Sequence, residues 1–353
     1  MTKLSSKREK WIDVCRAIAI ILVLLGHNNP PFIKYIFGFH VPMFFLISGY
    51  LYKDVQAGDE IKYLKKTFTR YFAPYYILSL VNLVIRVLMI KFLQPDYIFL
   101  AKEIWDYVIA IVYVAPDHMP GCGPMWFLPS LAAALLIFMM LRKIRIKAVY
   151  YFSIVCMALI SIYLSGKGQF VQIGEWNEFL PLRLHASLLG VVFLQIGLLI
   201  KKYDFVKKID ARSVLTKTAV IVLMLALGAL TIRVNDVNPW IDMNNARYGN
   251  AILMILGAVL MTLAIMMVCN VGEKSLQKIY SPMQILGKHT IIILAFDEAS
   301  NAIGGIAIGY LHLPFEWYTA FAVRITALAV MVVIWQLIIR MVGNKKIMNF
   351  LNW

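Results

Sequence analysis

Ten apolar stretches of roughly bilayer-spanning length recur along the chain. With 61% hydrophobic residues, 15% charged residues and a mean hydropathy of +0.74, the sequence is too apolar for a soluble globular protein. Because the bilayer interior offers backbone groups no water to bond, repeated spans of this length are expected to be helices. We therefore expect an all-α, polytopic integral membrane protein. The expected spans lie at about residues 12–29, 36–52, 72–93, 125–141, 148–165, 184–200, 218–232, 250–269, 287–308 and 319–341.

No linker, low-complexity tract or obvious internal repeat divides these stretches, so we expect residues 1–353 to form a single integral membrane domain. The four cysteines show neither close pairing nor the spacing of metal ligands. We therefore expect no disulfide framework and no metal site. The cysteines are Cys15, Cys122, Cys156 and Cys269.

Lysine and arginine are unevenly distributed among the connecting segments. If the N-terminus is cytoplasmic, 25 of the 35 basic residues lie in cytoplasmic segments, seven lie in outer segments and three lie within spans. This bias predicts that both termini lie inside, and it explains the net charge of +16 without a nucleic-acid partner. A cleaved secretory signal is the alternative for residues 1–29, but no small-residue cleavage pattern follows and the apolar run contains Arg16.

The first expected span, IDVCRAIAIILVLLGH, contains two ionisable residues, Arg16 and His27. Eleven positions at about 100° each bring them to within about 20° of the same helix face, about 16 Å apart along the axis. Ionisable groups inside a membrane are costly and usually mark a functional site. Arg16 could bind a phosphate near the cytoplasmic side, and His27 could take a proton from a hydroxyl or accept an acyl group. Alternatively, Arg16 extends to the inner headgroups and His27 marks the outer interface.

The second expected span begins FHVPMFFLISGYLY and places His40 one short loop after His27. A helical hairpin brings the end of one helix beside the start of the next. His40 could therefore orient His27 or bind an acceptor hydroxyl. The small residues Ser48 and Gly49 allow a close contact between helices.

These residues resemble the membrane-bound acyltransferase family 3, whose members O-acylate cell-envelope carbohydrates. Its hallmark is an arginine and a histidine separated by ten residues in the first helix, matched here by Arg16 and His27. FHVPMFFLISGYLY is similar to a segment of the branch that includes fucose and exopolysaccharide O-acetylases. KKTFTRYFAPYY resembles the basic start of the family's third helix, with Arg70 at the matching place, and GPMWFLPSL resembles its WFL segment. The resemblance covers essentially the whole chain and is most specific over residues 11–52.

The resemblance implies a fold, a donor and an acceptor. The implied donor substrate is acetyl-coenzyme A, the implied acceptor is a cell-envelope glycan or lipid-linked sugar, and the implied location is the bacterial cytoplasmic membrane. Arg70 would then bind phosphate of the donor together with Arg16. Trp126 would either stack on a sugar ring of the acceptor or anchor its helix at the interface.

One position departs from the family pattern. Where the family often has a histidine at the end of an apolar run, LGKHTIIILAFDEAS has Asp297. A carboxylate at that depth must find a partner, reach water or stay protonated. Arg324 in the last expected span is its natural partner, and a structural ion pair and an acceptor-binding role are both compatible with the sequence.

We therefore interpret the chain as an O-acyltransferase that moves an acyl group, most simply acetyl, from cytoplasmic acyl-coenzyme A to a carbohydrate hydroxyl. One alternative is a transporter or flippase for an envelope glycan, in which the buried charges line a translocation path. Another is a non-catalytic membrane subunit. The sequence shows no inverted repeat or pair of matched broken helices that would favour a transporter, and a non-catalytic subunit has no need for Arg16 and His27 on one helix face.

Overall fold

The computed structural model describes residues 9–119 and 121–342. This part of the chain is built almost entirely of helices, and its strands are β1 (Val171–Ile173) and β2 (Trp176–Glu178), which form one antiparallel hairpin. The all-α prediction is therefore confirmed. Lys3, Lys7 and Arg8 and the C-terminal Lys345 and Lys346, which contribute to the predicted orientation, lie outside the described residues.

Eight helical stretches in the described part of the chain are long and apolar enough to cross a membrane. Several of them combine two or three helical elements that follow one another in the chain. They are Ile33–Tyr50 (α2, Ile33–Phe37; α3, His40–Tyr50), Glu60–Leu93 (α4, Glu60–Thr67; η1, Phe68–Phe72; α5, Ala73–Leu93), Gly123–Leu141 (η3, Gly123–Trp126; α7, Phe127–Leu141), α8 (Lys147–Lys167), Pro181–Lys202 (η4, Pro181–Arg183; α9, Leu184–Lys202), α11 (Val214–Asn235), α12 (Ala251–Ser275) and α16 (Trp317–Val342).

The two remaining expected spans are not regular long helices. The first forms α1 (Lys10–Gly26), whose 17 residues extend about 25 Å, less than the thickness of a typical hydrocarbon core. The ninth is broken into α13 (Gln277–Lys288), α14 (Thr290–Ala295) and α15 (Asp297–Tyr310). Breaks at membrane depth are tolerated where the backbone is buried in protein or lines a cavity. The other described helices, which are shorter, are α6 (Ala101–Tyr113), η2 (Pro116–His118) and α10 (Phe205–Asp210).

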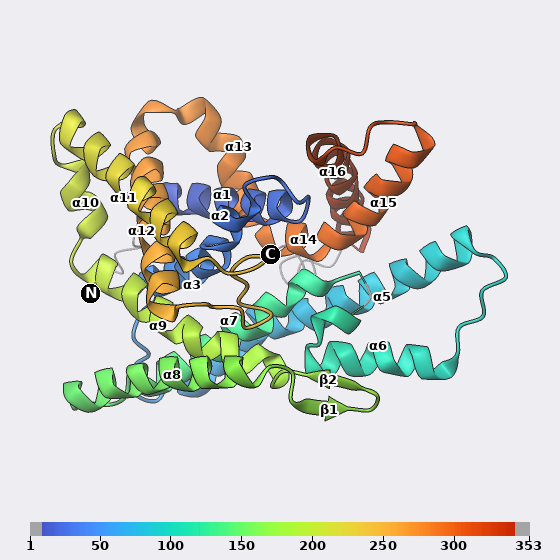
Figure 1. The fold of residues 1–353 in the computed structure, drawn as a ribbon, viewed down its shortest axis with the longest axis horizontal. Helices are drawn as coiled ribbons and strands as arrows, with labels where there is room; N and C mark the ends of the chain where they lie inside the picture. The colour runs from blue at the N-terminus through green and yellow to red at the C-terminus, as the bar shows by residue number, and fades with distance from the viewer. Residues whose placement is uncertain (1–8, 120, 343–353) are drawn as a thin grey trace.

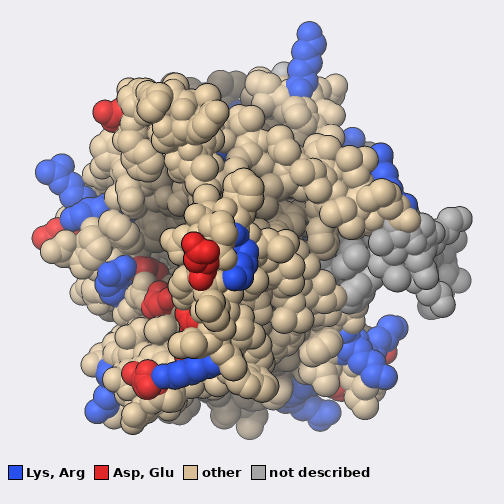
Figure 2. All heavy atoms as spheres, turned by 90° about the vertical axis from the view of Figure 1, so that its right-hand side faces the viewer, with Lys and Arg blue, Asp and Glu red and all other residues tan. Residues whose placement is uncertain are grey.

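The long helices divide into central and peripheral ones (Figure 1). Over 18 consecutive residues of the stretches that contain α3, α7 and α9, 61%, 67% and 61% of the residues are buried, against 11–22% in those of α5, α8, α11 and α16. The exposed faces of the peripheral helices carry large apolar side chains. On the face shown in Figure 2, charged side chains are scattered and most of the surface carries none. The peripheral helices are therefore the ones suited to contact lipid.

Glycines hold the central helices α3 and α9 unusually close. A Cβ atom at Gly49 would overlap the backbone carbonyl of Leu194, and one at Gly197 would overlap the carbonyl of Leu46. The expected close contact at Gly49 is therefore confirmed. This packing fixes α3, which begins at His40, against the buried centre of the molecule.

Candidate active site

Two cavities adjoin inside the helical assembly. The first, of about 520 Å³, is lined by both His27 and His40, and we call it the histidine cavity. The second, of about 750 Å³, is lined by six lysine and arginine side chains, and we call it the basic cavity. Both cavities are lined by Arg16, Ser48, Arg70 and Tyr71. The two arginines therefore stand where the cavities meet.

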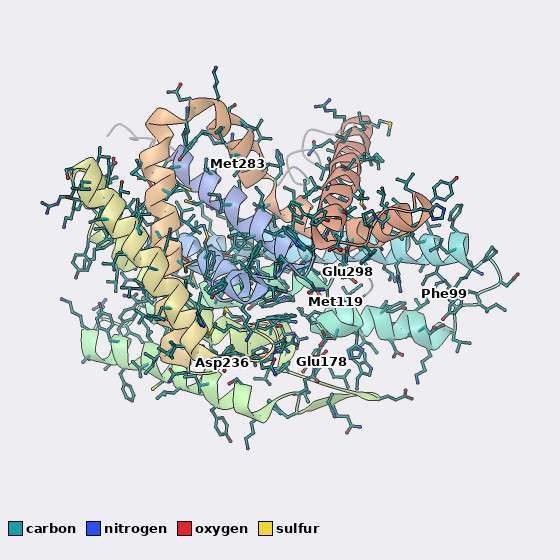
Figure 3. All side chains as sticks on the ribbon, turned by 45° about the horizontal axis from the view of Figure 1, so that its top comes forward. Phe99, Met119, Glu178, Asp236, Met283 and Glu298 are labelled. Carbon is teal, nitrogen blue, oxygen red and sulfur yellow. The ribbon has the colours of Figure 1, made fainter. Side chains whose placement is uncertain are left out.

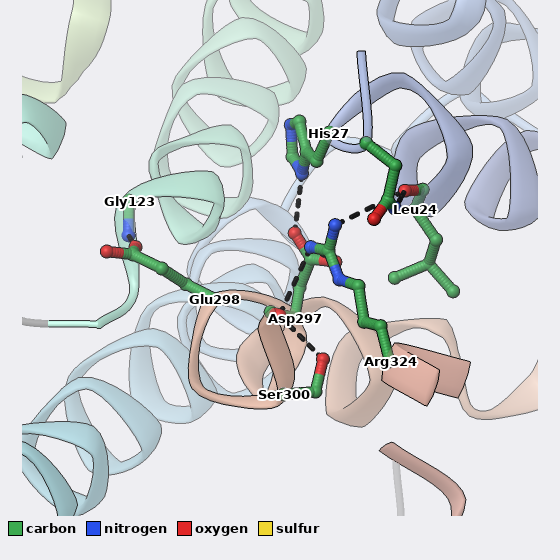
Figure 4. A network of polar contacts seen from close by, with 8 residues as sticks. Leu24, His27, Gly123, Asp297, Glu298, Ser300 and Arg324 are labelled. Atoms are coloured by element: carbon green, nitrogen blue, oxygen red, sulfur yellow. Dashed lines mark hydrogen bonds and ion pairs between the residues drawn. The ribbon is translucent and has the colours of Figure 1, made fainter. Parts of the chain in front are cut away.

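His27 is held by a buried carboxylate at the end of α1 (Figure 4). Its Nδ1 lies 2.5 Å from Oδ2 of Asp297, and the other carboxylate oxygen pairs with Nη2 of Arg324. Arg324 also donates from Nη2 to the Asp297 carbonyl at 3.1 Å and from Nη1 to the Leu24 carbonyl at 3.4 Å. The expected pairing of Asp297 with Arg324 is confirmed, and the structure adds His27 as a third member.

The network orients the imidazole. The side chains of Asp297 and Arg324 are both 1% exposed, whereas that of His27 is 28% exposed and borders the histidine cavity. An ionised carboxylate only accepts hydrogen bonds, so Nδ1 of His27 carries the proton and donates it. In the neutral imidazole Nε2 then has the lone pair, and no described residue hydrogen-bonds to it. The arrangement matches the carboxylate–histidine pair of hydrolases, in which the carboxylate fixes the tautomer of the base.

The break between α14 and α15 brings Asp297 to this position. Nδ2 of Asn82, on α5, donates to the carbonyl of Ala295 at 3.0 Å, just before the break. Oγ of Ser300 donates to the carbonyl of Asp297 at 2.7 Å. The Ala295 carbonyl, at the end of α14, thus has a partner from α5, as burial requires. Asp297 also lies in the first turn of α15, where the helix dipole favours a negative charge.

A second carboxylate ties α15 to the other wall of the histidine cavity. Oε2 of Glu298 accepts a hydrogen bond of 2.7 Å from the backbone N–H of Gly123. Figure 3 shows Glu298 among the interior side chains. Sequence reasoning missed both Asn82 and Glu298. The available signal was a polar residue inside each of two apolar stretches, but nothing local indicated its partner.

His40 does not orient His27. Its Nδ1 lies 2.8 Å from the carbonyl oxygen of Ile36, one turn earlier in the chain. The ring of Phe37 contacts both imidazoles, with centroid distances of 4.8 Å to His40 and 6.3 Å to His27. The orienting role expected of His40 therefore belongs to Asp297. His40 still lines the histidine cavity, and its expected contact with an acceptor hydroxyl stays a prediction.

Arg70 owes its position to a local widening of its helix. Pro74 lacks the N–H that would bond to the Arg70 carbonyl in an α-helix, and the preceding turn, η1, is a π-helix. The guanidinium lies 5.5 Å from the centroid of the Tyr71 ring. Arg16 reaches the same place from α1, with Nη1 3.5 Å from Oδ1 of Asp13. The expected common face of Arg16 and His27 is confirmed, because both line the histidine cavity.

The basic cavity carries more positive than negative charge. Its cationic lining is Arg16, Lys53, Lys62, Lys66, Arg70 and Lys201, and its carboxylates are Glu9, Asp13, Asp54 and Asp59. The negative charge of Asp54 is balanced by Arg142, which does not line the cavity. Nε and Nη2 of Arg142 donate to the two carboxylate oxygens of Asp54 at 2.7 and 2.8 Å. These hydrogen bonds hold the pKa of Asp54 below its ordinary value. The cavity is therefore suited to an anionic group.

Aromatic and amide side chains line the other end of the histidine cavity. Trp126, for which acceptor stacking and interfacial anchoring were both open, is 7% exposed and forms part of this wall. The connection between α11 and α12 forms another part, with Trp240, Asp242, Met243, Asn244, Asn245 and Arg247. Sequence reasoning missed this segment, although WIDMNNAR is a cluster of aromatic and polar residues between two apolar stretches.

A model of a family described as an acyltransferase domain matches residues 9–341. The match spans α1, which carries Arg16, as well as Asp297 and Arg324. No curated protein and no solved structure matches the chain at a significant level.

Proposed function

Since this chain belongs to acyltransferase family 3, we propose that it transfers an acetyl group from acetyl-coenzyme A to a hydroxyl of a cell-envelope carbohydrate. The observation that carries the proposal is the pair of adjoining cavities. They place two arginines where the cavities meet, and a histidine oriented by a buried carboxylate farther along the same space. A phosphate-bearing donor and a hydroxyl-bearing acceptor can thus be bound from opposite ends.

We assign His27 as the general base. Its Nε2 takes the proton of the acceptor hydroxyl, and the hydroxyl oxygen then forms a C–O bond to the carbonyl carbon of the thioester. The C–S bond breaks, and the proton is returned to the leaving thiolate. Asp297 keeps Nδ1 of the ring protonated and stabilises the imidazolium that forms.

The basic cavity fits the phosphates of the donor. A guanidinium binds phosphate through two parallel hydrogen bonds, and Arg16 and Arg70 offer two such groups where the cavities meet. Lysines of the basic cavity provide further charge. Positive-inside orientation puts this cavity at the cytoplasmic side, where a soluble thioester donor is available. Both termini would then be cytoplasmic.

The transporter alternative is less well supported by the same residues. A translocation path needs charges that meet the cargo, whereas Asp297 and Arg324 are buried and bound to each other. A subunit without catalytic activity would have no use for an imidazole whose tautomer is fixed beside an open cavity. The observed geometry therefore favours a catalytic role over transport or a purely structural role.

Mass spectrometry of the envelope polysaccharides tests this function. Cells that express the protein are compared with cells that lack it and with cells that express a His27→Ala variant at an equal level. We expect O-acetyl groups on a carbohydrate only when the intact protein is present. Identical polysaccharides in all three strains, with the protein present in the membrane, would contradict the proposal.

Arg16 provides a prediction about the donor. Arg16→Lys should retain part of the affinity for acetyl-coenzyme A, because lysine keeps the charge but loses the forked geometry. Arg16→Ala should weaken binding about tenfold to a hundredfold, the usual effect of losing hydrogen bonds to a charged group. Calorimetric titration of purified protein measures both, with the exposed Arg212→Ala as a control. If both Arg16 variants bind as tightly as the wild type, the phosphate site must be sought at Arg70.

A further inference from the structure

The connection between α11 and α12, residues 236–250, is a rigid part of the cavity wall. It begins at Asp236, at the end of α11 (Figure 3). Asn235, the last residue of α11, holds the far end of the connection beside its start. Its Nδ2 donates to the Tyr248 carbonyl at 2.9 Å, and its Oδ1 accepts from the Asn250 N–H at 2.7 Å. From α9, Nε2 of His185 donates to the carbonyls of Met243 and Asn244 at 3.2 and 3.0 Å.

Asp242 folds the tip of this connection around itself. Oδ1 accepts from the backbone N–H groups of Asn244 and Asn245 at 2.9 and 3.3 Å. Oδ2 accepts from Nδ2 of Asn245 at 2.8 Å and from Nη2 of Arg247 at 2.9 Å. The charges of Asp242 and Arg247 therefore balance each other, and Asp242 stabilises the conformation of the tip.

Some buried polar atoms of the tip are left without a hydrogen-bond partner by this folding. They are Nε1 of Trp240, Oδ1 of Asn244 and Nε of Arg247, which have no partner among the described residues and belong to side chains that line the histidine cavity. The Trp240 ring packs on Phe37, with centroids 5.2 Å apart, and Phe37 in turn contacts His27. Trp126 lines the same cavity. The histidine cavity is thus lined by two indoles, by the amide of Asn244 and by Arg247, whose free Nε lies beside the pair that it forms with Asp242.

We propose that the tip, Trp240–Arg247, binds the acceptor and selects a neutral hydroxylated ring over an anionic one. This inference rests on the proposed function and adds the acceptor's class and its binding residues. An indole packs on the apolar face of a sugar ring, while an indole N–H and an amide oxygen satisfy hydroxyl groups. Each unpartnered buried group then gains the hydrogen bond that it lacks.

Charge disfavours an anionic acceptor at the tip. The one guanidinium there, Arg247, is bound to Asp242, and Asp117 adds a carboxylate to the same cavity. The other cations of the histidine cavity are Arg16, Arg70 and Lys288. Arg16 and Arg70 also border the basic cavity. Lys288 follows Gly287, which packs against the backbone of Asp13, and Asp13 lies on α1 one turn before Arg16. These cations are therefore placed for the donor.

The test uses purified wild-type protein with acetyl-coenzyme A and three acceptor probes: methyl fucoside, methyl glucoside and methyl glucuronide. Thiol release without a glycoside reports hydrolysis of the donor, in which water takes the acyl group in place of the acceptor hydroxyl, and mass spectrometry of the glycosides reports transfer. We expect transfer to the two neutral glycosides and at least tenfold less to the glucuronide. In Trp240→Ala and Asn244→Ala, the KM for a neutral glycoside should rise about threefold to tenfold.

Asp236→Asn is the matched control, since Asp236 belongs to the same connection, is exposed and lies outside the cavity lining. Its KM should equal that of the wild type. Equal transfer to the glucuronide, or unchanged KM values in both tip variants, would overturn this inference while leaving the proposed function intact. Absence of both thiol release and transfer in the wild type would overturn the proposed function, and this inference with it.

Discussion

Replacing His27 by alanine should lower the rate of acyl transfer by about 10²–10⁴-fold, the usual contribution of a general base. The protein should still fold, because Asp297 keeps its ion pair with Arg324 and no buried charge loses its last partner. The measurement is the transfer rate of purified protein at a saturating concentration of acetyl-coenzyme A. His312→Ala, an exposed histidine between α15 and α16 and outside the cavity lining, is the control and should keep full activity.

Two outcomes would change the role of His27. More than half of the wild-type rate in His27→Ala would remove His27 from the mechanism. An acyl carrier instead of a general base would show itself as a covalent adduct when wild-type protein is incubated with acetyl-coenzyme A and no acceptor. Mass spectrometry of the intact protein detects such an adduct, and its absence is what the general-base assignment predicts.

The second large effect concerns the buried pair of Asp297 and Arg324. Removing one partner of such a pair typically costs about 3–5 kcal/mol of stability, because the remaining charge is left uncompensated. Asp297→Asn and Arg324→Gln should therefore each lower the thermal stability of detergent-extracted protein. The double variant should recover part of the loss, since neither charge remains buried alone. Additive losses in the double variant would contradict an energetic coupling between the two residues.

Activity separates the structural role of Asp297 from its effect on His27. In Asp297→Asn the amide can donate to Nδ1 of His27, which moves the imidazole proton to Nε2 and removes the base. We therefore expect a loss of transfer of up to about 10⁴-fold, as for the same change in a serine protease triad, and no rescue by Arg324→Gln. Glu298→Gln is the matched control, because its amide oxygen can still accept from the Gly123 N–H. A stable and active Asp297→Asn variant would show that this carboxylate neither stabilises the fold nor orients His27.

Local patterns in the sequence were sufficient for the membrane class of this protein and for half of its candidate site. Apolar stretches predicted helices, and eight of the ten expected spans correspond to long apolar helices among the described residues. Helical periodicity placed Arg16 and His27 on one face, and both line the histidine cavity. The ninth span was expected as one helix but is broken at His289 and Phe296, and at the second break Asn82 of α5 satisfies the Ala295 carbonyl.

By itself the sequence determined the features that depend on residues close together in the chain. These are the helical fold, the position of each ionisable group along its helix and the excess of basic residues in alternate connections. The tertiary structure alone decided which groups meet. His27 and Asp297 are 270 residues apart, and no periodicity relates two helices that far apart in the chain. His40 is nearer in sequence, and orienting His27 was one of its two expected roles. The residue that contacts His27 is instead Asp297, which the break before α15 brings to that position. The tip at Trp240–Arg247 joins the site for the same reason, since packing between distant helices decides which side chains border one cavity.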